Sequence, residues 1–301
     1  MVSANVITQN RQLHQLSSKK LSESTIVCHF VAKDMPVILR PDTLLDVCRW
    51  QYFFLSERNG QMLLKSKMVQ RLAGGFLERW GTNRVCGLQR LFLGTHKDRK
   101  IIKLMKRVRK EVGGPMTNEA FILMSLANSQ SQLPGDFAEV GVFRGGSARF
   151  LCEAKGDTTL RLFDTYAGLP EGSEIDGKVF RKSQYACSQP AVANYLKDYK
   201  NLHYYEGLFP DSTEGVEEVC EAKYSLAHFD VDLYEGTLAC LEFFYPRMVP
   251  GGVMITHDYS ILAGVKKAFD EFFAEKPEGL IEMPTTQCMV IKLSDEDSQS
   301  S

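Results

Sequence analysis

The chain has 301 residues, of which 44% are apolar and 24% charged, and this composition predicts a globular protein with one full domain and a smaller partner. The formal net charge of −1 gives no overall signal for binding nucleic acid. No apolar run approaches the roughly 20 residues that span a bilayer, and residues 1–20 lack an apolar signal core. We therefore expect neither a nucleic-acid-binding protein nor a transmembrane segment.

Eight cysteines are dispersed along the chain, without a Cys-x-x-Cys pair and without a histidine at zinc-finger spacing. This pattern predicts reduced thiols and a cytoplasmic setting. The cysteines are Cys28, Cys48, Cys86, Cys152, Cys187, Cys220, Cys240 and Cys288.

The chain begins with polar residues 1–24, which we predict to be disordered, and ends with an acidic, Ser-rich tail at residues 295–301. Residues 25–112 are predicted to form a partly helical N-terminal region. Between Lys65 and Lys110 there are fourteen Lys and Arg residues and two acids. This stretch is therefore the basic part of the chain.

Residues 101–108 carry apolar side chains at helical spacing with cationic residues around them, which predicts an amphipathic helix. Such a helix can pack on its own domain or on a partner subunit and leave its basic face in water. It can also form a lid or docking surface for an anionic substrate, or lie on a membrane surface.

Residues 113–294 alternate strand-like and helix-like segments, after a helix that Thr117 or Asn118 can cap. Five strand–helix units precede two strands separated by too few residues for a crossover. The pattern predicts a Rossmann-like α/β fold with a mostly parallel, seven-stranded sheet and an antiparallel C-terminal hairpin. Ligands of such sheets bind beyond the carboxyl ends of the strands. The expected strands are residues 137–140, 160–163, 202–205, 225–229, 253–256, 280–283 and 288–293.

The first strand enters a Gly-rich turn from Glu139 to Ser147, and Asp164 follows Gly141 by 23 residues at the end of the next strand. An acid at that place can accept hydrogen bonds from two ribose hydroxyls. Phe143 stands where a dinucleotide site needs a second glycine, and Glu139 suits the cationic amino-acid end of S-adenosylmethionine (SAM) better than a diphosphate. The alternative is a tight turn without a ligand.

Five segments, in the expected order, resemble the macrocin O-methyltransferase family, whose members are class I SAM-dependent enzymes that methylate sugar or related hydroxyls of antibiotics. The resemblance does not cover residues 1–110. The segments are residues 134–147, 163–170, 207–212, 229–235 and 245–252.

The resemblance implies a site for SAM in residues 113–294, and it implies a homo-oligomer. Asp164 would hold the ribose, and four residues of the turn would line the methionine end. These four are Glu139, Gly141, Gly145 and Ser147.

The family depends on Mg²⁺, and the resemblance implies a divalent metal bound by Asp230, His257 and Asp258, with Asp232 as general base. The family has Asp-Asp where this chain has His257-Asp258. Three arrangements are therefore open: a site for Mn²⁺ or another transition metal, a two-carboxylate Mg²⁺ site, or a metal-free site with His257 as base. A fourth interpretation is that these residues only cap loops. His228 is expected to be a hydrogen-bonded core residue.

The predicted function is SAM-dependent O-methylation of a small molecule, a sugar or glycosylated natural product, assisted by a metal. The long loop at residues 166–188 is expected to cover the cofactor and part of the acceptor site. One alternative is a metal-independent enzyme that methylates an amine or phenol. Another is a non-catalytic SAM-binding protein whose basic region docks a partner.

Overall fold

The computed structural model describes residues 76–177 and 180–294, all of which fall within one compact unit. The predictions for residues 1–24 and for the tail at residues 295–301 lie outside the described residues. The same holds for residues 65–75 of the basic stretch.

Within the described residues, seven strands form one sheet in the order β3-β2-β1-β4-β5-β7-β6. Strands β1 to β5 are parallel, and β7 pairs antiparallel with both β5 and β6. This confirms the predicted fold class, including the antiparallel hairpin. The strands are β1 Asp136–Val140, β2 Leu160–Asp164, β3 Leu202–Glu206, β4 Tyr224–Phe229, β5 Met248–Thr256, β6 Ile281–Glu282 and β7 Cys288–Ile291.

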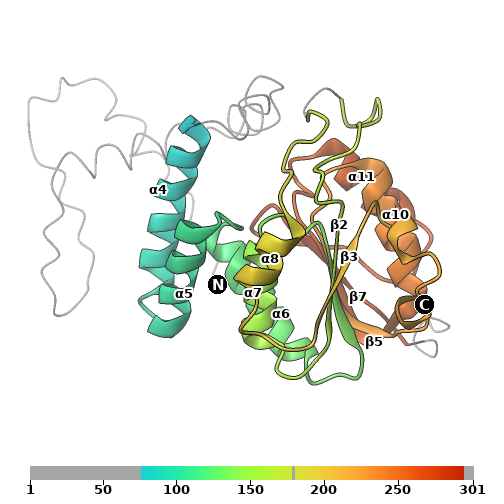
Figure 1. The fold of residues 1–301 in the computed structure, drawn as a ribbon, viewed down its shortest axis with the longest axis horizontal. Coiled ribbons are helices and arrows are strands. Elements are labelled where there is room, and N and C mark those ends of the chain that lie inside the picture. The colour runs from blue at the N-terminus through green and yellow to red at the C-terminus, as the bar shows by residue number, and fades with distance from the viewer. Residues whose placement is uncertain (1–75, 178–179, 295–301) are drawn as a thin grey trace, which may run out of the picture. The chain divides into compact units, whose positions relative to one another are not determined.

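Helices cover both faces of the sheet, with α6, α7 and α8 on one side and α10 and α11 on the other (Figure 1). Each side has its own apolar core, because side chains alternate between the faces along every strand. None of the helices in the described residues is long and apolar enough to cross a membrane. The helices are α4 Phe76–Leu93, α5 Arg99–Glu111, α6 Thr117–Gln130, α7 Gly146–Ala154, α8 Gln189–Tyr195, α9 Glu217–Cys220, α10 Tyr234–Phe244 and α11 Ala263–Phe273, with single 3₁₀ turns at Asp211–Thr213 and Tyr245–Arg247.

The basic amphipathic helix is α5, and its apolar stripe packs within this unit. Leu104, Met105 and Val108 are buried in a cluster with Ala120 of α6 and Phe150 of α7. The cationic residues at positions 103, 106, 107 and 110 are exposed. Of the two packing partners predicted for this helix, its own domain or a partner subunit, the structure shows its own domain; the role of the exposed basic face stays a prediction.

The start of α6 differs from the prediction, because neither Thr117 nor Asn118 caps this helix. The cap residue is Met116, whose N–H donates to Glu119 Oε2 at 2.7 Å. The Thr117 hydroxyl donates instead to the carbonyl of Cys86 in α4, at 3.1 Å. The Thr117 side chain therefore makes a tertiary contact rather than a cap. The free N–H of Met116 is instead satisfied by the carboxylate of Glu119, the third residue of α6.

Candidate active site

The Gly-rich turn between β1 and α7 brings the chain against the end of β4. Gly141 has φ +90°, and a Cβ at this position would lie 2.0 Å from the carbonyl oxygen of Asp230. Only glycine fits such an approach without moving backbone. Gly145 has φ +77° and begins α7 in the left-handed conformation. The turn is thus fixed by two glycines, and it ends at a helix N-terminus of the kind that leaves amides free for a ligand.

Asp164, the last residue of β2, lies against this turn. Its Oδ2 accepts hydrogen bonds from the N–H groups of Val142 at 2.8 Å and Phe143 at 2.7 Å, and its Oδ1 accepts from Tyr166 N–H at 2.7 Å. A carboxylate offers about four lone pairs, so contact with a ribose hydroxyl is compatible with these bonds. The structure places Asp164 where the sequence predicted it; the ribose contact stays a prediction.

Glu139 is fully buried and pairs with His228, which faces it across the β1–β4 register. Glu139 Oε1 lies 2.9 Å from His228 Nδ1, so His228 is the hydrogen-bonded core residue that the sequence predicted. Burial raises the pKa of Glu139, although hydrogen bonding with His228 and Ser147 works against this rise. No hydrogen bond of ordinary geometry reaches Glu139 Oε2 from the described residues, so this oxygen lacks a donor.

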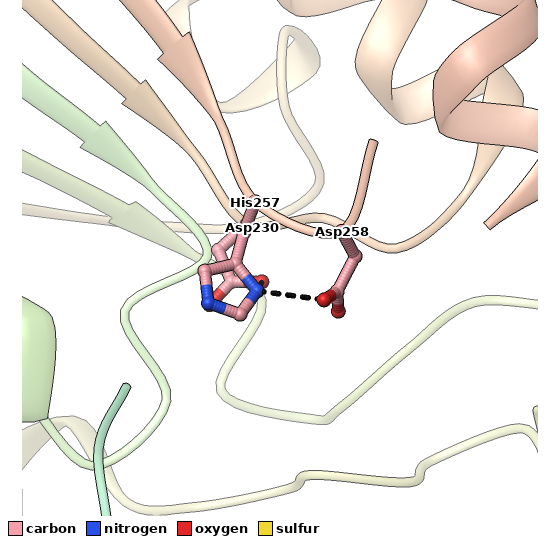
Figure 2. A group of neighbouring side chains, drawn as sticks. All are labelled: Asp230, His257 and Asp258. Carbon is pink, nitrogen blue, oxygen red and sulfur yellow. Dashed lines mark ion pairs between the residues drawn. The ribbon is translucent and has the colours of Figure 1, made fainter. Parts of the chain in front are cut away.

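Three polar side chains meet where β4 and β5 end. Asp230 follows β4, and His257 and Asp258 follow β5, which pairs in parallel with β4. One ligand atom from each lies within 4.8 Å of the other two. His257 Nδ1 is 3.0 Å from Asp258 Oδ1 and 3.7 Å from Asp230 Oδ1, and Figure 2 shows the three side chains gathered at the strand ends. Two carboxylates and one imidazole are a chemically suitable donor set for a divalent cation.

Side-chain alternation along an extended β4 would put Asp230 and Asp232 on the same side, but the structure does not continue the strand that far. Strand β4 ends at Phe229, and Asp232 has φ +61°, so strand geometry does not relate it to Asp230. It is also not part of the three-residue group found among the described residues. Burial raises the pKa of Asp232 well above its usual range, and the charges of Asp230 and Asp258 raise it further. Asp232 therefore lies near the acidic group and has the perturbed pKa typical of a catalytic carboxyl.

The His257 ring is surrounded by carboxylates on both sides. Its Nε2 lies 3.0 Å from Glu119 Oε2, and its Nδ1 faces Asp258. Burial alone would lower the pKa of His257, but the charges of Asp258, Asp230 and Glu119 outweigh burial and raise it well above 6.5. The three carboxylates thus favour the protonated form of the ring.

The loop after β2 returns to the Gly-rich turn. The N–H of Cys187 donates to Tyr166 O at 3.0 Å, and its thiol contacts Phe143 O at 2.8 Å. Asp176, further along the loop, accepts a hydrogen bond from Tyr234 N–H at the start of α10, at 2.8 Å. The described parts of this loop therefore contact both the Gly-rich turn and α10. These contacts are compatible with a loop that covers the cofactor, and that role stays a prediction.

The family model described as Macrocin-O-methyltransferase (TylF) matches residues 123–287, which is more than half of the chain. The chain belongs to the macrocin O-methyltransferase family. The match includes the Gly-rich turn, Asp164 and the acidic group, whereas Glu119 lies just before it.

Two curated relatives are similar to part of the chain. One is the 8-demethyl-8-(2,3-dimethoxy-alpha-L-rhamnosyl)-tetracenomycin-C 4'-O-methyltransferase of Streptomyces olivaceus, with 31% identity over 43% of this chain and 54% of the relative. The other is the demethyldecarbamoylnovobiocin O-methyltransferase of Streptomyces niveus, with 29% identity over 48% of this chain and 60% of the relative. The matched region thus spans little more than half the length of these relatives.

Solved structures support the fold. The O-methyltransferase NovP matches with a TM-score of 0.52 and 25% identity, over 59% of this chain and 81% of NovP. The calicheamicin methyltransferase CalS11 matches with a TM-score of 0.51 and 18% identity, over 65% of this chain and 94% of CalS11. At 18% identity the second likeness bears on the fold alone.

Sequence reasoning missed Glu119, although it contacts a predicted site residue. Glu119 precedes His257 by 138 residues and lies on a helix before the sheet begins. In the sequence it is an ordinary acid in the first turn of a helix, a position where acids are common. Only its burial, with 1% of its surface exposed, distinguishes it, and no spacing in the sequence reveals that burial.

Proposed function

We propose that this chain is a SAM-dependent O-methyltransferase that methylates a hydroxyl of a small molecule, a sugar or a glycosylated natural product. The supporting observation is the arrangement at the carboxyl edge of the sheet. The Gly-rich turn, Asp164 and the acidic group of Asp230, His257 and Asp258 all lie there, in a chain of the macrocin O-methyltransferase family. The names of the two relatives, which describe O-methyltransferases acting on a rhamnosyl-tetracenomycin and a novobiocin precursor, favour the acceptor class.

Residues 113–294 would form the methyltransferase domain, and SAM would supply an electrophilic methyl group. Asp164 would accept hydrogen bonds from the ribose. The turn would hold the methionine end through Glu139, Gly141, Gly145 and Ser147. The free Oε2 of Glu139 fits this assignment, because a buried oxygen without a donor costs about 1–3 kcal/mol and an ammonium group could satisfy it.

Asp230, His257 and Asp258 would hold a divalent cation, Mg²⁺ or Mn²⁺. The donor set fits, since carboxylates and one imidazole nitrogen converge within 4.8 Å. When bound, such a cation would lower the pKa of a hydroxyl that coordinates it. Its charge would also relieve the repulsion between Asp230 and Asp258.

Asp232 would act as the general base. The acceptor oxygen bonds to the methyl carbon as the carbon–sulfur bond breaks, and the hydroxyl proton passes to the Asp232 carboxylate. His257 is less suited as base without a metal, because the carboxylates around its ring raise its pKa and favour its protonated form.

The decisive experiment incubates the full chain with radiolabelled SAM and a panel of glycosylated aromatic and macrolide acceptors, before and after dialysis against EDTA. We expect methyl transfer to a sugar hydroxyl. EDTA should abolish this transfer, and added Mg²⁺ or Mn²⁺ should restore it. Turnover on amines or phenols that is unaffected by EDTA would favour the metal-independent alternative. SAM binding without turnover on any acceptor would favour an interaction protein.

Three further properties belong to this proposal. We infer a homo-oligomer from the family, a small-molecule acceptor rather than nucleic acid from the charge balance, and a cytoplasmic setting from the cysteines. All six cysteines among the described residues are free thiols. Size-exclusion chromatography with light scattering would measure the oligomeric state.

A further inference from the structure

Glu119 contacts the acidic group from the opposite side to Asp230 and Asp258. Its Oε2 lies 3.0 Å from His257 Nε2, while the other ring nitrogen, Nδ1, lies 3.0 Å from Asp258 Oδ1. The side chain of Glu119 is 2% exposed and that of His257 is 16% exposed. The contact is therefore largely removed from water, which strengthens it relative to a surface ion pair.

The Glu119 carboxylate is itself held in place by two further hydrogen bonds. Oε2 also accepts from Met116 N–H at 2.7 Å, and Oε1 accepts from the Thr286 hydroxyl at 2.9 Å. Contacts with His257, Met116 and Thr286 thus hold the Glu119 carboxylate in place.

The contact between Glu119 Oε2 and His257 Nε2 determines which ring nitrogen is free for other partners. With Nε2–H donating to Glu119, the ring cannot flip without losing this bond, and Nδ1 remains the nitrogen directed to Asp230 and Asp258. A carboxylate that accepts from the distal N–H of a histidine orients the ring and increases the basicity of the other nitrogen. Glu119 lies where such a supporting carboxylate would lie.

We propose that Glu119 is a positioning residue that holds His257 with Nδ1 toward Asp230 and Asp258, so that the group binds a transition-metal dication such as Mn²⁺ in preference to Mg²⁺. This inference rests on the metal-assisted function proposed above and specifies its metal. An imidazole nitrogen favours first-row transition metals, whereas Mg²⁺ strongly prefers oxygen ligands. Because the ring is held in one orientation before any metal binds, the site needs no rearrangement to favour a transition metal.

The test measures metal binding by the full chain rather than turnover. Free Mn²⁺ is followed by electron paramagnetic resonance during titration, and Mg²⁺ is added as competitor. The variants are Glu119→Gln, His257→Asp and the double variant, with Asp198→Asn, at an exposed acid between α8 and β3, as a control. Thermal unfolding and SAM binding by calorimetry establish that each variant is folded.

We expect Mn²⁺ to bind the unaltered chain more tightly than Mg²⁺, and His257→Asp to narrow this difference. Glu119→Gln should weaken Mn²⁺ binding by about 10–100-fold, the usual effect of removing such a supporting partner. In the His257→Asp background the same change should have little effect, because there is no ring left to orient. Pulsed resonance of bound Mn²⁺ should show coupling to a nitrogen nucleus that disappears in His257→Asp, and Asp198→Asn should bind Mn²⁺ like the unaltered chain.

Equal Mn²⁺ affinity with and without the Glu119 carboxylate would overturn the proposal, as would an effect of Glu119→Gln that persists without His257. If neither Mn²⁺ nor Mg²⁺ binds, this inference fails together with the metal part of the proposed function. Methyl transfer itself would remain open to the separate turnover assay with EDTA. The two failures are therefore distinguishable.

Discussion

Glu139 of β1 and His228 of β4 face each other in the parallel register, with Glu139 Oε1 2.9 Å from His228 Nδ1. Both side chains are buried, at 0% and 1% exposed. The pair lies within the two central strands whose ends carry the Gly-rich turn and Asp230. The polar contact therefore links the core of the sheet to the proposed cofactor site.

Removing the histidine from this pair should destabilise the fold. His228→Ala would remove the histidine partner of the buried Glu139 carboxyl and should lower the free energy of unfolding by about 3–5 kcal/mol. Glu139→Gln keeps the shape of the side chain and can still hydrogen-bond to the ring, so its loss should be smaller. Urea denaturation followed by circular dichroism measures both variants. If His228→Ala lowers the free energy of unfolding no more than Glu139→Gln does, this account is wrong.

Asp164→Ala should weaken SAM binding. The variant loses a charged acceptor for the ribose and also the bonds that hold Val142 and Phe143 in the turn. The expected loss is about 1.5–3 kcal/mol, the range for hydrogen bonds to charged groups. Calorimetric titration with SAM is the measurement, and Asp198→Ala, at an exposed acid after α8, is the control. Unchanged affinity in Asp164→Ala would remove Asp164 from the site.

Asp232→Ala should abolish turnover and leave SAM binding intact. The reason is that Asp232 is assigned to the proton of the acceptor rather than to the cofactor. General bases typically contribute about 10²–10⁴-fold to the rate, which sets the expected loss in kcat. Single-turnover assays beside SAM calorimetry separate the two effects, with Glu235→Ala, an exposed acid of α10, as control. Activity within a few-fold of the unaltered chain would exclude Asp232 as the base.

Stability in acid should depend in part on Glu278. Its Oε1 accepts from Lys292 Nζ at 2.7 Å and its Oε2 accepts from the Tyr245 hydroxyl at 2.9 Å. Burial alone would raise the pKa of Glu278, but these two contacts outweigh it and lower the pKa below 4.5. A carboxyl with a lowered pKa in the folded state adds stability above its unfolded pKa, and loses it as the pH falls through its folded pKa.

The variant Glu278→Gln should therefore be less stable than the unaltered chain at pH 7, and the difference should shrink as the pH falls below about 4.5, near the unfolded pKa of a glutamate. Urea midpoints across this pH range measure the difference. Glu282→Gln, at an acid exposed on the neighbouring strand β6, is the matched control. If the urea midpoints of Glu278→Gln and the unaltered chain differ by the same amount at all pH values, the lowered pKa of Glu278 is not the cause of the lost stability.

Much of the fold could be predicted because the signals are local. The buried run of β4 and the alternating segments around it predict a parallel sheet, and the short link between residues 283 and 288 predicts the antiparallel hairpin. Parallel strands all carry their carboxyl ends at one edge. Asp164, Asp230 and Asp258 could therefore be assigned to that edge from sequence alone.

The α/β fold and the Gly-rich turn follow from the sequence pattern, and the family resemblance added the group of Asp230, His257 and Asp258. The position of Asp232 at φ +61° and the contact of Glu119 with His257 across 138 residues came from the packed structure alone. The physical reason is that the packing of α6 against the sheet, rather than any sequence spacing, brings Glu119 to the end of β5.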